Sequence, residues 1–175
     1  MKKYQEIKGD LIDLALSGAF DVIVHGCNCF CKQNAGIAKQ MVETFNTNLF
    51  NLENNGIPGE YDKLGNIEWK LRLVDYDKKV WESNAIGILK STNRTFFSLI
   101  VVNAYTQYEW NSKTKPFDYE AFTMCLKKIN HKFKDKTIGM PKIGSGLAGG
   151  NWNIIKELIQ KYLPDCYVTI VEYYK

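Results

Sequence analysis

Short apolar runs alternate along the chain with segments in which every third or fourth residue is apolar. The first pattern is typical of strands and the second of the helices that cover them. Strands are predicted at residues 4–8, 22–25, 67–74, 85–89, 96–103, 137–140 and 166–172. Helices are predicted to start after Asp10, Gly36, Asp118 and Gly150, and to end near Gly18, Phe45, Phe133 and Tyr162. This alternation predicts one α/β domain over residues 1–175, with three layers (α/β/α) and a mixed central sheet.

The strand predicted at residues 22–25 is the centre of the interpretation. It is apolar and β-branched, as buried strands are, and it stops at His25. A small polar loop then leads to Gly36 and the next helix. Ligands of open α/β sheets bind beyond the carboxyl ends of the strands, and a helix start in that place attracts phosphate. His25 and Asn28 are therefore expected beside a ligand, although a histidine that only anchors the loop stays an alternative.

A second glycine-rich loop follows the strand predicted at residues 137–140. Residues 144–149 match the pattern G-x-G-x-x-G, but only one strand remains after them, so a complete dinucleotide-binding domain is not predicted. Both glycine loops lie between a strand and a helix, where backbone N–H groups can approach oxygen atoms closely. Two such loops suit a diphosphate. The sequence lacks the G-K-[ST] lysine of ATP-hydrolysing loops.

Three further stretches carry predictions. Residues 46–66 are rich in Asn and Gly and are predicted to form a long loop with a turn or two of helix. Loops of this length are often functional lids. Residues 75–79 and 91–94 are predicted turns. Residues 105–110 are predicted to form an aromatic loop whose rings cover the end of the sheet or, alternatively, flank a ligand.

The composition is that of a globular protein, with 45% hydrophobic residues and a net charge of +4. So mild a charge tolerates an anionic ligand but does not by itself indicate a nucleic-acid binder, and the lysines at 132–136 are predicted to form a solvated helix end. No apolar run is long enough to span a membrane, and residues 1–6 lack the apolar core of a signal peptide. We expect a cytoplasmic monomer that needs no membrane and no cofactor.

Cys27, Cys29 and Cys31 form C-x-C-x-C beside His25, an arrangement that raises the question of a metal site. Zinc sites usually combine C-x₂₋₄-C pairs, and the rest of the chain offers no such pair. The odd count of five cysteines argues against a disulfide framework. A catalytic cysteine is not favoured either, because no second histidine is obviously placed to activate it. The sequence therefore predicts no metal.

Three motifs in this order resemble the macro domain family: residues 9–11, residues 24–29 with 35–38, and residues 141–152. The resemblance covers nearly the whole chain and implies the macro domain fold and binding of ADP-ribose. Within the family, the segment H-x-C-N-C that begins at His25 most resembles the branch of ADP-ribose-1''-phosphate phosphatases.

The resemblance implies a role for each matched residue. Asp10, between Gly9 and Leu11, would accept a hydrogen bond from the adenine amino group. Asn28 would bind the distal ribose, and His25 matches a histidine proposed to act in the phosphatase branch. Tyr173 would cover the adenine. The diphosphate would lie between Asn34, Ala35, Gly36, Ile37 and Ala38 on one side and Ile143, Gly144, Ser145, Gly146, Leu147, Ala148 and Gly149 on the other.

The sequence also departs from some relatives. Those that cleave ADP-ribosyl esters use a lysine and an aspartate, and the corresponding positions fall near Asn103 and at Ala148. Many relatives have Asp where this chain has Asn151. His25 is then the main titratable group of the motifs, and its reference pKa of about 6.5 suits proton transfer.

Three functions follow from the resemblance. The favoured one is a phosphatase that converts ADP-ribose 1''-phosphate to ADP-ribose and phosphate, with His25 and Asn28 as its catalytic residues. The alternatives are a module that binds ADP-ribose or a related nucleotide signal without turnover, and a hydrolase that removes ADP-ribose from protein or nucleic acid.

Overall fold

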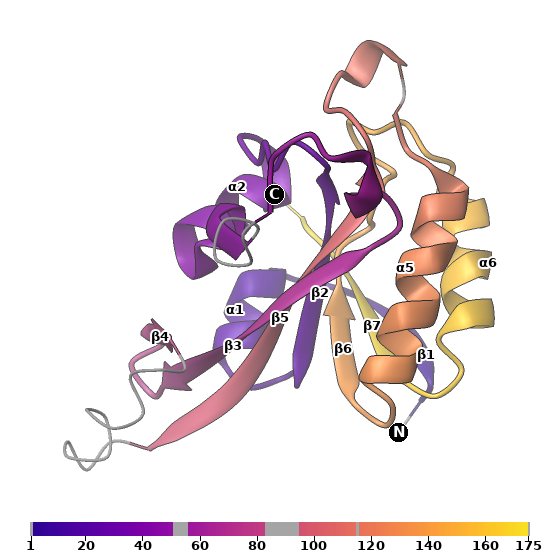
Figure 1. The fold of residues 1–175 in the computed structure, drawn as a ribbon. Helices are drawn as coiled ribbons and strands as arrows, with labels where there is room; N and C mark the ends of the chain where they lie inside the picture. The colour runs from indigo at the N-terminus through magenta and orange to yellow at the C-terminus, as the bar shows by residue number, and fades with distance from the viewer. Residues whose placement is uncertain (1, 51–55, 83–94, 115, 175) are drawn as a thin grey trace.

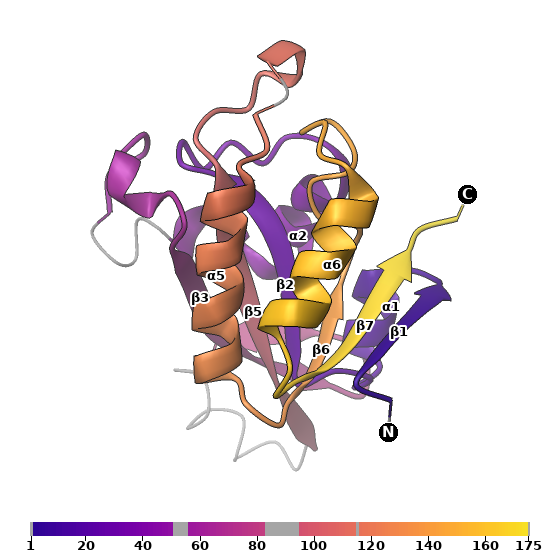
Figure 2. The same ribbon diagram turned by 90° about the vertical axis from the view of Figure 1, so that its right-hand side faces the viewer.

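The computed structural model describes residues 2–50, 56–82, 95–114 and 116–174. A seven-stranded sheet lies between two layers of helices, α1 and α2 on one face and α5 and α6 on the other (Figures 1 and 2). The strands are β1 (Tyr4–Lys8), β2 (Val22–Asn28), β3 (Ile67–Asp75), β4 (Val80–Glu82), β5 (Phe96–Gln107), β6 (Thr137–Met140) and β7 (Tyr167–Glu172). The helices are α1 (Leu11–Leu16), α2 (Gly36–Phe45), α5 (Tyr119–Lys132) and α6 (Trp152–Tyr162). The strand predicted at residues 85–89 and the turn at 91–94 lie outside the described residues.

The strand order is β1-β7-β6-β2-β5-β3-β4. The pairings among β1, β7, β6, β2 and β5 are parallel, whereas β3 pairs antiparallel with both β5 and β4. The predicted α/β class and mixed sheet are confirmed. The carboxyl ends of the five parallel strands meet at one edge of the sheet, and the loops that follow them form the site described below.

Alternate residues of β2 face the two helix layers, as the pleat of a strand requires. Val22 and Val24 pack in the core beneath α5 and α6, and Ile23 packs in the core beneath α1 and α2. His25 has the parity of Ile23 and therefore points toward the α1 and α2 side. Both faces of β2 are covered, which explains its nearly continuous apolar sequence.

Acidic or amide side chains cap the starts of α1, α5 and α6. Asp10 accepts hydrogen bonds from the backbone N–H groups of Ile12 and Asp13, and Asp118 accepts one from Ala121. Both N-caps were predicted from the sequence. Asn151, which stands where many macro domains have Asp, caps α6 through the N–H of Asn153. These caps fix where the chain leaves the carboxyl ends of β1 and β6.

Two strands are longer than their sequences predicted. β2 continues to Asn28 and β5 to Gln107, and the two stay paired through Cys27 and Tyr105. Tyr105 is fully buried, so the prediction that an aromatic loop starts there is wrong; that loop begins at Tyr108. Pairing on both sides of β5 carries the strand past the apolar run that signalled it.

The long segment at residues 46–66 contains, in its described parts, two single turns of 3₁₀ helix at Thr47–Leu49 and Tyr61–Lys63. This agrees with the predicted loop, of which residues 51–55 lie outside the described residues. The predicted turn at residues 75–79 joins β3 to β4, with Lys78 in the left-handed conformation. Over the described ranges, no helix is both long and apolar enough to span a membrane.

Candidate ligand-binding site

Two hollows lie beyond the carboxyl ends of the parallel strands. The first, the Asp10 hollow, has a volume of about 500 Å³ and is lined by Asp10, Leu11, Gly36, Ile37, Gln40, Pro141, Lys142, Val171, Glu172 and Tyr173. The second, the Asn28 hollow, has a volume of about 290 Å³ and is lined by Gly26, Cys27, Asn28, Lys32, Gln33, Asn34, Ala35, Ala38, Gln107, Trp110, Leu147 and Ala148. Segments far apart in the sequence thus meet at one edge of the sheet.

The two glycine loops border both hollows. At the start of α2, Gly36 and Ile37 line the Asp10 hollow, while Ala35 and Ala38 line the Asn28 hollow. The loop after β6 does the same, with residues 141–142 in the first hollow and 147–148 in the second. A single elongated ligand that occupied both hollows would therefore pass between the two loops.

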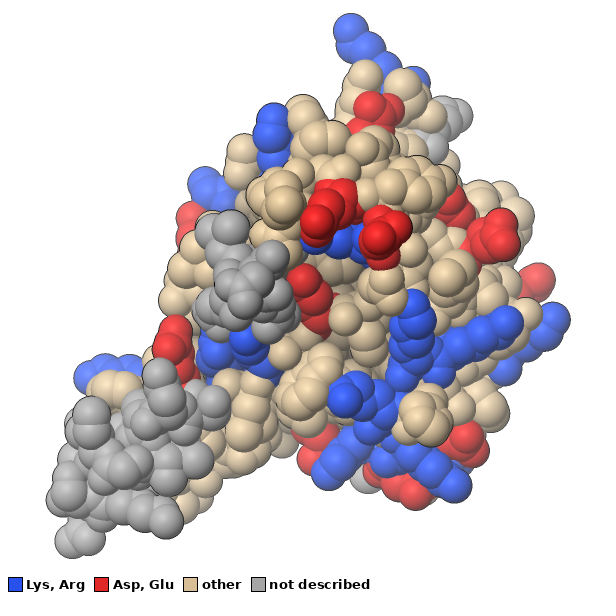
Figure 3. Space-filling model, in the orientation of Figure 1, with Lys and Arg blue, Asp and Glu red and all other residues tan. Residues whose placement is uncertain are grey.

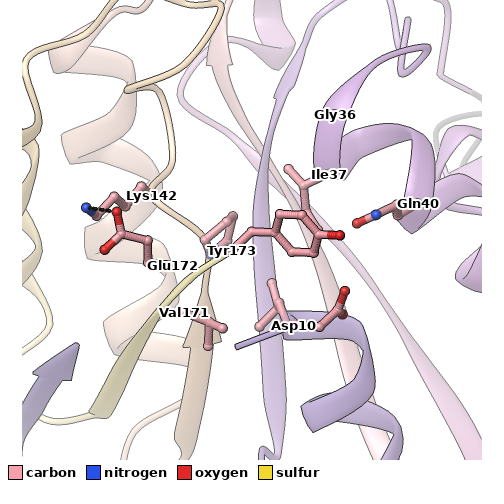
Figure 4. A pocket seen from close by; sticks show the side chains of 10 residues that line it. Asp10, Gly36, Ile37, Gln40, Lys142, Val171, Glu172 and Tyr173 are labelled. Carbon is pink, nitrogen blue, oxygen red and sulfur yellow. Dashed lines mark hydrogen bonds and ion pairs between the residues drawn. The ribbon is translucent and has the colours of Figure 1, made fainter. Parts of the chain in front are cut away.

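The two oxygens of the Asp10 carboxylate have different hydrogen bonding. Oδ1 accepts the capping hydrogen bonds from Ile12 N at 2.8 Å and Asp13 N at 3.0 Å. Oδ2 has no hydrogen-bond partner among the residues that the structure describes. Figure 4 shows the carboxylate at the border of the hollow, on the opposite side of the Tyr173 ring from Ile37. An acceptor is thus available to a ligand without any loss of the cap.

Tyr173 and Gln40 form the opposite part of the same hollow. The Tyr173 ring crosses the hollow with its hydroxyl pointing toward Gln40 (Figure 4), and Tyr173 is 60% exposed. The Gln40 amide is not hydrogen-bonded to any described residue. Behind Tyr173, Lys142 forms an ion pair with Glu172 at 2.7 Å. The hollow therefore offers the aromatic face of Tyr173 and two polar groups, Asp10 Oδ2 and the Gln40 amide, that have no hydrogen-bond partner among the described residues.

The start of α2 has no side-chain cap. Ala35, the N-cap residue, is extended and has no side chain that could accept a capping hydrogen bond. Gly36 has a φ of 56°. The first N–H groups of α2 therefore have no side-chain partner at the point where the two hollows adjoin. Such a helix start carries a partial positive charge that favours an anion.

The loop after β6 is held by its own backbone. Gly150 N donates to Gly144 O at 2.8 Å, and Gly149 N donates to Gly146 O at 3.0 Å. Gly144 and Gly149 have φ values of 75° and 73°, which other residues adopt only with strain. A Cβ at Gly144 would lie 2.2 Å from Phe117, whereas one at Gly146 would meet nothing within 4 Å. Gly144 is therefore needed for folding, and Gly146 faces open space.

In the Asn28 hollow, the Asn28 side chain holds the following loop. Its Nδ2 donates to Lys32 O at 2.6 Å, and its Oδ1 accepts from Lys32 N at 3.1 Å. The ammonium group of Lys32 lies 3.6 Å from the centroid of the Trp110 ring. Within the described residues no carboxylate is paired with Lys32, so the hollow carries an uncompensated positive charge.

His25 lies beneath the site rather than in it. Its side chain is fully buried and lines neither hollow, which differs from the expectation that it faces the ligand. Nε2 donates to Asn103 Oδ1 at 2.7 Å, because Asn103 Nδ2 is itself donating to Thr47 O at 2.9 Å. Burial lowers the pKa of His25 to about 4, so the ring is neutral at physiological pH.

His25 is one of five buried residues that contact one another in a closed cycle, which we call the buried polar ring. Its members are His25, Asn103, Thr47, Gln33 and Cys27. Thr47 Oγ1 donates to Gln33 Oε1 at 2.5 Å, and Gln33 Nε2 donates to Cys27 Sγ at 3.6 Å. Cys27 Sγ closes the ring at 3.8 Å from His25 Nδ1, the ring nitrogen that is left to accept a hydrogen bond in this tautomer. Burial raises the pKa of the Cys27 thiol well above its usual range, so no thiolate nucleophile is present here.

Cys27, Cys29 and Cys31 lie close together in the sequence beside His25. Over the described ranges, no group of three or more His, Cys, Asp or Glu side chains is placed to hold a metal ion.

The chain is 30% identical over 171 residues to an uncharacterised 17.5 kDa protein from the tk-vs intergenic region of enterobacteria phage T4. The match covers 95% of this chain and 94% of the phage protein. The chain belongs to the family of this phage protein. No family model matches the sequence.

Solved structures show the fold of this family. The chain is similar to the macrodomain of Thermus aquaticus DarG, with a TM-score of 0.58, 16% identity and 98% of each chain covered. It is also similar to Thermosipho africanus DarTG in complex with ADP-ribose, with a TM-score of 0.66 and 14% identity over 99% of this chain and 42% of that chain. A protein of Bacteroides thetaiotaomicron matches with a TM-score of 0.64 and 22% identity over 97% of this chain and 99% of that chain. This member of the phage family therefore has the macrodomain fold.

The fold brings most of the expected ligand residues to the two hollows. The Asp10 hollow gathers Asp10, Leu11, Gly36, Ile37 and Tyr173, and the Asn28 hollow gathers Asn28, Asn34, Ala35, Ala38, Leu147 and Ala148. The expected residues that line neither hollow are Gly9, His25, Ile143, Gly144, Ser145, Gly146 and Gly149. Ile143 is a core residue.

Several residues that line the hollows were not predicted from the sequence. They include Gln40 and Lys142 in the Asp10 hollow, and Lys32, Gln107 and Trp110 in the Asn28 hollow. Lys142 and Lys32 stand within or beside the two glycine loops, and that position was a usable signal. Gln40 looks like an ordinary surface residue of a helix, and nothing in the sequence marks it.

Proposed function

We propose that the protein binds ADP-ribose, with the adenine in the Asp10 hollow, the distal ribose in the Asn28 hollow and the diphosphate between the glycine loops. The observation that carries the proposal is that each glycine loop borders both hollows. A ligand with two flat or ring-shaped ends joined by an anionic link fits this arrangement. The likeness in fold to a DarTG that holds ADP-ribose supports the same ligand.

Backbone N–H groups would hold the diphosphate. The start of α2 lacks a side-chain cap, and the N–H groups of Gly146, Leu147 and Ala148 have no partner among the described residues. Hydrogen bonds from backbone N–H groups to charged oxygens are stronger than those between neutral groups. The site therefore needs no lysine directed at the diphosphate.

The adenine would be selected by hydrogen bonds at its edge and stacking on its face. Asp10 Oδ2 accepts a hydrogen bond from the exocyclic amine, and Tyr173 supplies the ring. Gln40 adds a second amide group at the same hollow. A base with a carbonyl in place of the amine would set two acceptors against each other at Asp10, so it should bind more weakly.

Isothermal calorimetry tests this proposal. The protein is titrated with ADP-ribose, with inosine diphosphate ribose, with ADP and with ribose 5-phosphate. ADP-ribose should bind most tightly, and the inosine analogue about tenfold or more weakly, because a charge-assisted hydrogen bond contributes about 1.5–3 kcal/mol. Equal affinity for ADP-ribose and its inosine analogue would contradict the adenine assignment, and no binding of ADP-ribose would contradict the proposal.

A second candidate function is hydrolysis of ADP-ribose 1''-phosphate, which one observation favours. The ammonium group of Lys32 lies in the Asn28 hollow, where a phosphate on the distal ribose would be, and no described carboxylate neutralises it. Asn28, which fixes Lys32 through its backbone, would act as a positioning residue. Lys32 would stabilise the charge on the phosphate during attack by water.

The proton transfer of such a reaction would not come directly from His25, which lies behind Cys27 and is neutral. The described lining of the Asn28 hollow contains no carboxylate and no imidazole. If the protein is a phosphatase of this kind, Lys32→Gln should lower phosphate release at least about tenfold. The same substitution should change the affinity for plain ADP-ribose much less.

A substrate panel separates the candidates. Purified protein is incubated with ADP-ribose 1''-phosphate, ADP-ribosylated protein and ADP-ribosylated DNA, and the release of phosphate or of ADP-ribose is measured. Phosphate release that depends on Lys32 supports the phosphatase. Binding of ADP-ribose without any release would leave the non-catalytic binding module. Release of ADP-ribose would support the third alternative, a hydrolase acting on protein or nucleic acid.

A further inference from the structure

Lysine side chains gather over the lower half of α5 and below it (Figure 3). We define the α5 basic face by Lys127, Lys128 and Lys132 of α5, Lys134 and Lys136 of the segment that follows, and Lys161 of α6. The sequence scatters these lysines, and only the short run at 132–136 is visible in it. The packing of α6 beside α5 and the turn into β6 bring them together.

The charge of this face is not neutralised by the protein. The described ion pairs involve Lys39, Lys63, Lys78, Lys142 and Lys156, all outside the α5 basic face. No lysine of the face is ion-paired with a described residue.

Aromatic rings hold three of these lysines instead. Lys132 Nζ lies 4.5 Å from the centroid of Trp69, and the ammonium groups of Lys127 and Lys161 lie 5.2 and 5.1 Å from that of Tyr162. A cation–π contact orients an ammonium group and leaves its charge available to a partner.

The acidic residues near this face are few. Asp135 is exposed between Lys134 and Lys136, and Asp165 accepts a hydrogen bond from Asn130 on the inner side of α5. Asp21 accepts hydrogen bonds from Thr137, and the exposed Glu157 lies one turn before Lys161 on α6. The six lysines outnumber these four carboxylates, so the face carries a net positive charge.

We propose that the α5 basic face binds the phosphate backbone of double-stranded nucleic acid, without regard to base sequence. A duplex is a dense, regular array of phosphates, and lysines that contact it gain free energy by releasing its condensed counterions. Trp69 is 38% exposed, but Lys132 lies over its ring, and Lys127 and Lys161 lie over that of Tyr162. An unpaired base could stack on these rings only by displacing the lysines. The face has the charge for the backbone of a duplex and lacks the open aromatic platform of a single-strand binder.

A membrane surface fits the face less well. Peripheral membrane helices insert apolar side chains among the lipids in addition to attracting their charge. On α5 the one exposed large apolar residue of the described chain is Met124, and it lies toward the opposite end of the helix from Lys132.

The α5 basic face is separate from the ligand hollows. Lys134 and Lys136 precede β6, whereas the loop that borders both hollows follows β6. Lys134 and Lys136 therefore lie at the opposite end of the sheet from the hollows, whereas Lys128 reaches back along α5 and donates to Gly65 O at 2.9 Å. No lysine of the face lines either hollow, so the proposal does not depend on the identity of the small ligand.

Fluorescence anisotropy of a labelled 20-base-pair DNA of mixed sequence tests the proposal. The parent should bind with a slope of log K against log salt of about −3 to −4, as expected for roughly four phosphate contacts. The variant Lys127→Gln/Lys132→Gln/Lys134→Gln should bind at least about tenfold more weakly and have a flatter slope. Its affinity for ADP-ribose and its melting temperature should stay near those of the parent.

The matched control is Lys8→Gln/Lys39→Gln/Lys78→Gln, which removes the same charge elsewhere on the surface. It should bind DNA more tightly than the α5 variant. Equal losses in the two triple variants would show that only net charge matters and would overturn the proposal. So would an absence of DNA binding by the parent, or binding to vesicles rich in phosphatidylserine that exceeds binding to DNA.

Discussion

At the scale of single residues, the two oxygens of the Asp10 carboxylate have different roles, one in the helix cap and one in the proposed recognition of the ligand. Oδ1 caps α1, and Oδ2 is free at the edge of its hollow. Asp10→Asn keeps the capping oxygen and replaces the free acceptor with an NH₂ donor, which would meet the amine of adenine. Calorimetry should show ADP-ribose binding weakened by about 1.5–3 kcal/mol, with the melting temperature little changed.

Asp10→Ala serves as the comparison, because it removes the cap and the acceptor together. It should lose affinity and also about 0.5–2 kcal/mol of stability. If Asp10→Asn binds ADP-ribose as tightly as the parent, Oδ2 does not select the base.

His25 makes stability depend on pH. Its pKa falls from about 6.5 in the unfolded chain to about 4 in the folded protein. The unfolded chain therefore binds more protons between these values, so the stabilising contribution is complete above pH 6.5 and is lost as the pH falls toward 4. The loss should be about 3 kcal/mol in total, as measured by urea unfolding from pH 7 to pH 4.5 and below.

Substitution of each histidine identifies the source of this dependence. His25→Gln should flatten the curve between pH 6.5 and 4.5, whereas the exposed His131→Gln should leave it unchanged. A His25→Gln variant with the parent's pH dependence would mean that another group is responsible.

Two residues lie where the sequence did not predict them. His25 was expected to face the ligand and is buried beneath the site, and Gln40 was not expected to line it. β2 is covered on both faces, so its apolar pattern does not reveal which way His25 points; that depends on which helices pack on which side. Gln40 reaches the site only because β7 ends opposite the middle of α2 and brings Tyr173 there. The capping role of Asp10 was predicted because it is local to the sequence, whereas its place in the ligand site was implied only by the resemblance to macro domains.

At the scale of elements, the uncapped start of α2 is where the diphosphate is proposed to bind. Ala35→Asp should cap the helix and raise stability by about 0.5–2 kcal/mol. The same carboxylate would lie where the diphosphate is proposed, so ADP-ribose should bind at least about tenfold more weakly. The melting temperature of Ala35→Asp should thus rise, whereas its affinity for ADP-ribose, measured by calorimetry, should fall.

Ala35→Ser is the control for this pair of effects. It supplies a capping oxygen without a charge, so it should raise stability and lower affinity much less than Asp does. Tighter binding by Ala35→Asp than by Ala35→Ser would place the anion elsewhere.

The second glycine loop gives a further contrast. Gly146→Val adds a side chain in open space, so it should obstruct the ligand and leave the melting temperature almost unchanged. Gly144→Ala should instead lower stability by about 1–3 kcal/mol, because it combines a positive φ with a contact of 2.2 Å to Phe117. A folded, fully binding Gly146→Val would exclude that part of the loop from the site.

Most elements were predictable from local sequence, and their ends were less so. Thr137–Met140 and Tyr4–Lys8 have the predicted bounds, because turn residues flank each run. β2 and β5 extend past theirs since each supports the other through pairing, which a single run of residues does not record. The convergence of the two loops was predicted from their equivalent places after strands, and the structure confirms it.

At the scale of the molecule, ADP-ribose should stabilise the whole fold, because the hollows join segments from distant parts of the sequence. A ligand at 100 times its dissociation constant adds about 2.7 kcal/mol. For a chain of this size the melting temperature should rise by roughly 5 to 10 °C. No rise in the parent, or an equal rise in Asp10→Asn at the same ligand concentration, would contradict the proposed site.

The pairing of β1 with β7 also has a consequence for protein synthesis. Gln5 Nε2 donates to Thr169 Oγ1, 164 positions along the chain, and the Asp10 hollow combines residues from just beyond both strands. While a ribosome is still translating the last strand, β1 has no neighbour and the edge of β6 that β7 will cover is open. The Asp10 hollow is therefore incomplete until β7 has paired with β1, and a small molecule can bind there only after that pairing. Translation stalled before β7 would yield a chain that displays an unpaired sheet edge to chaperones and proteases.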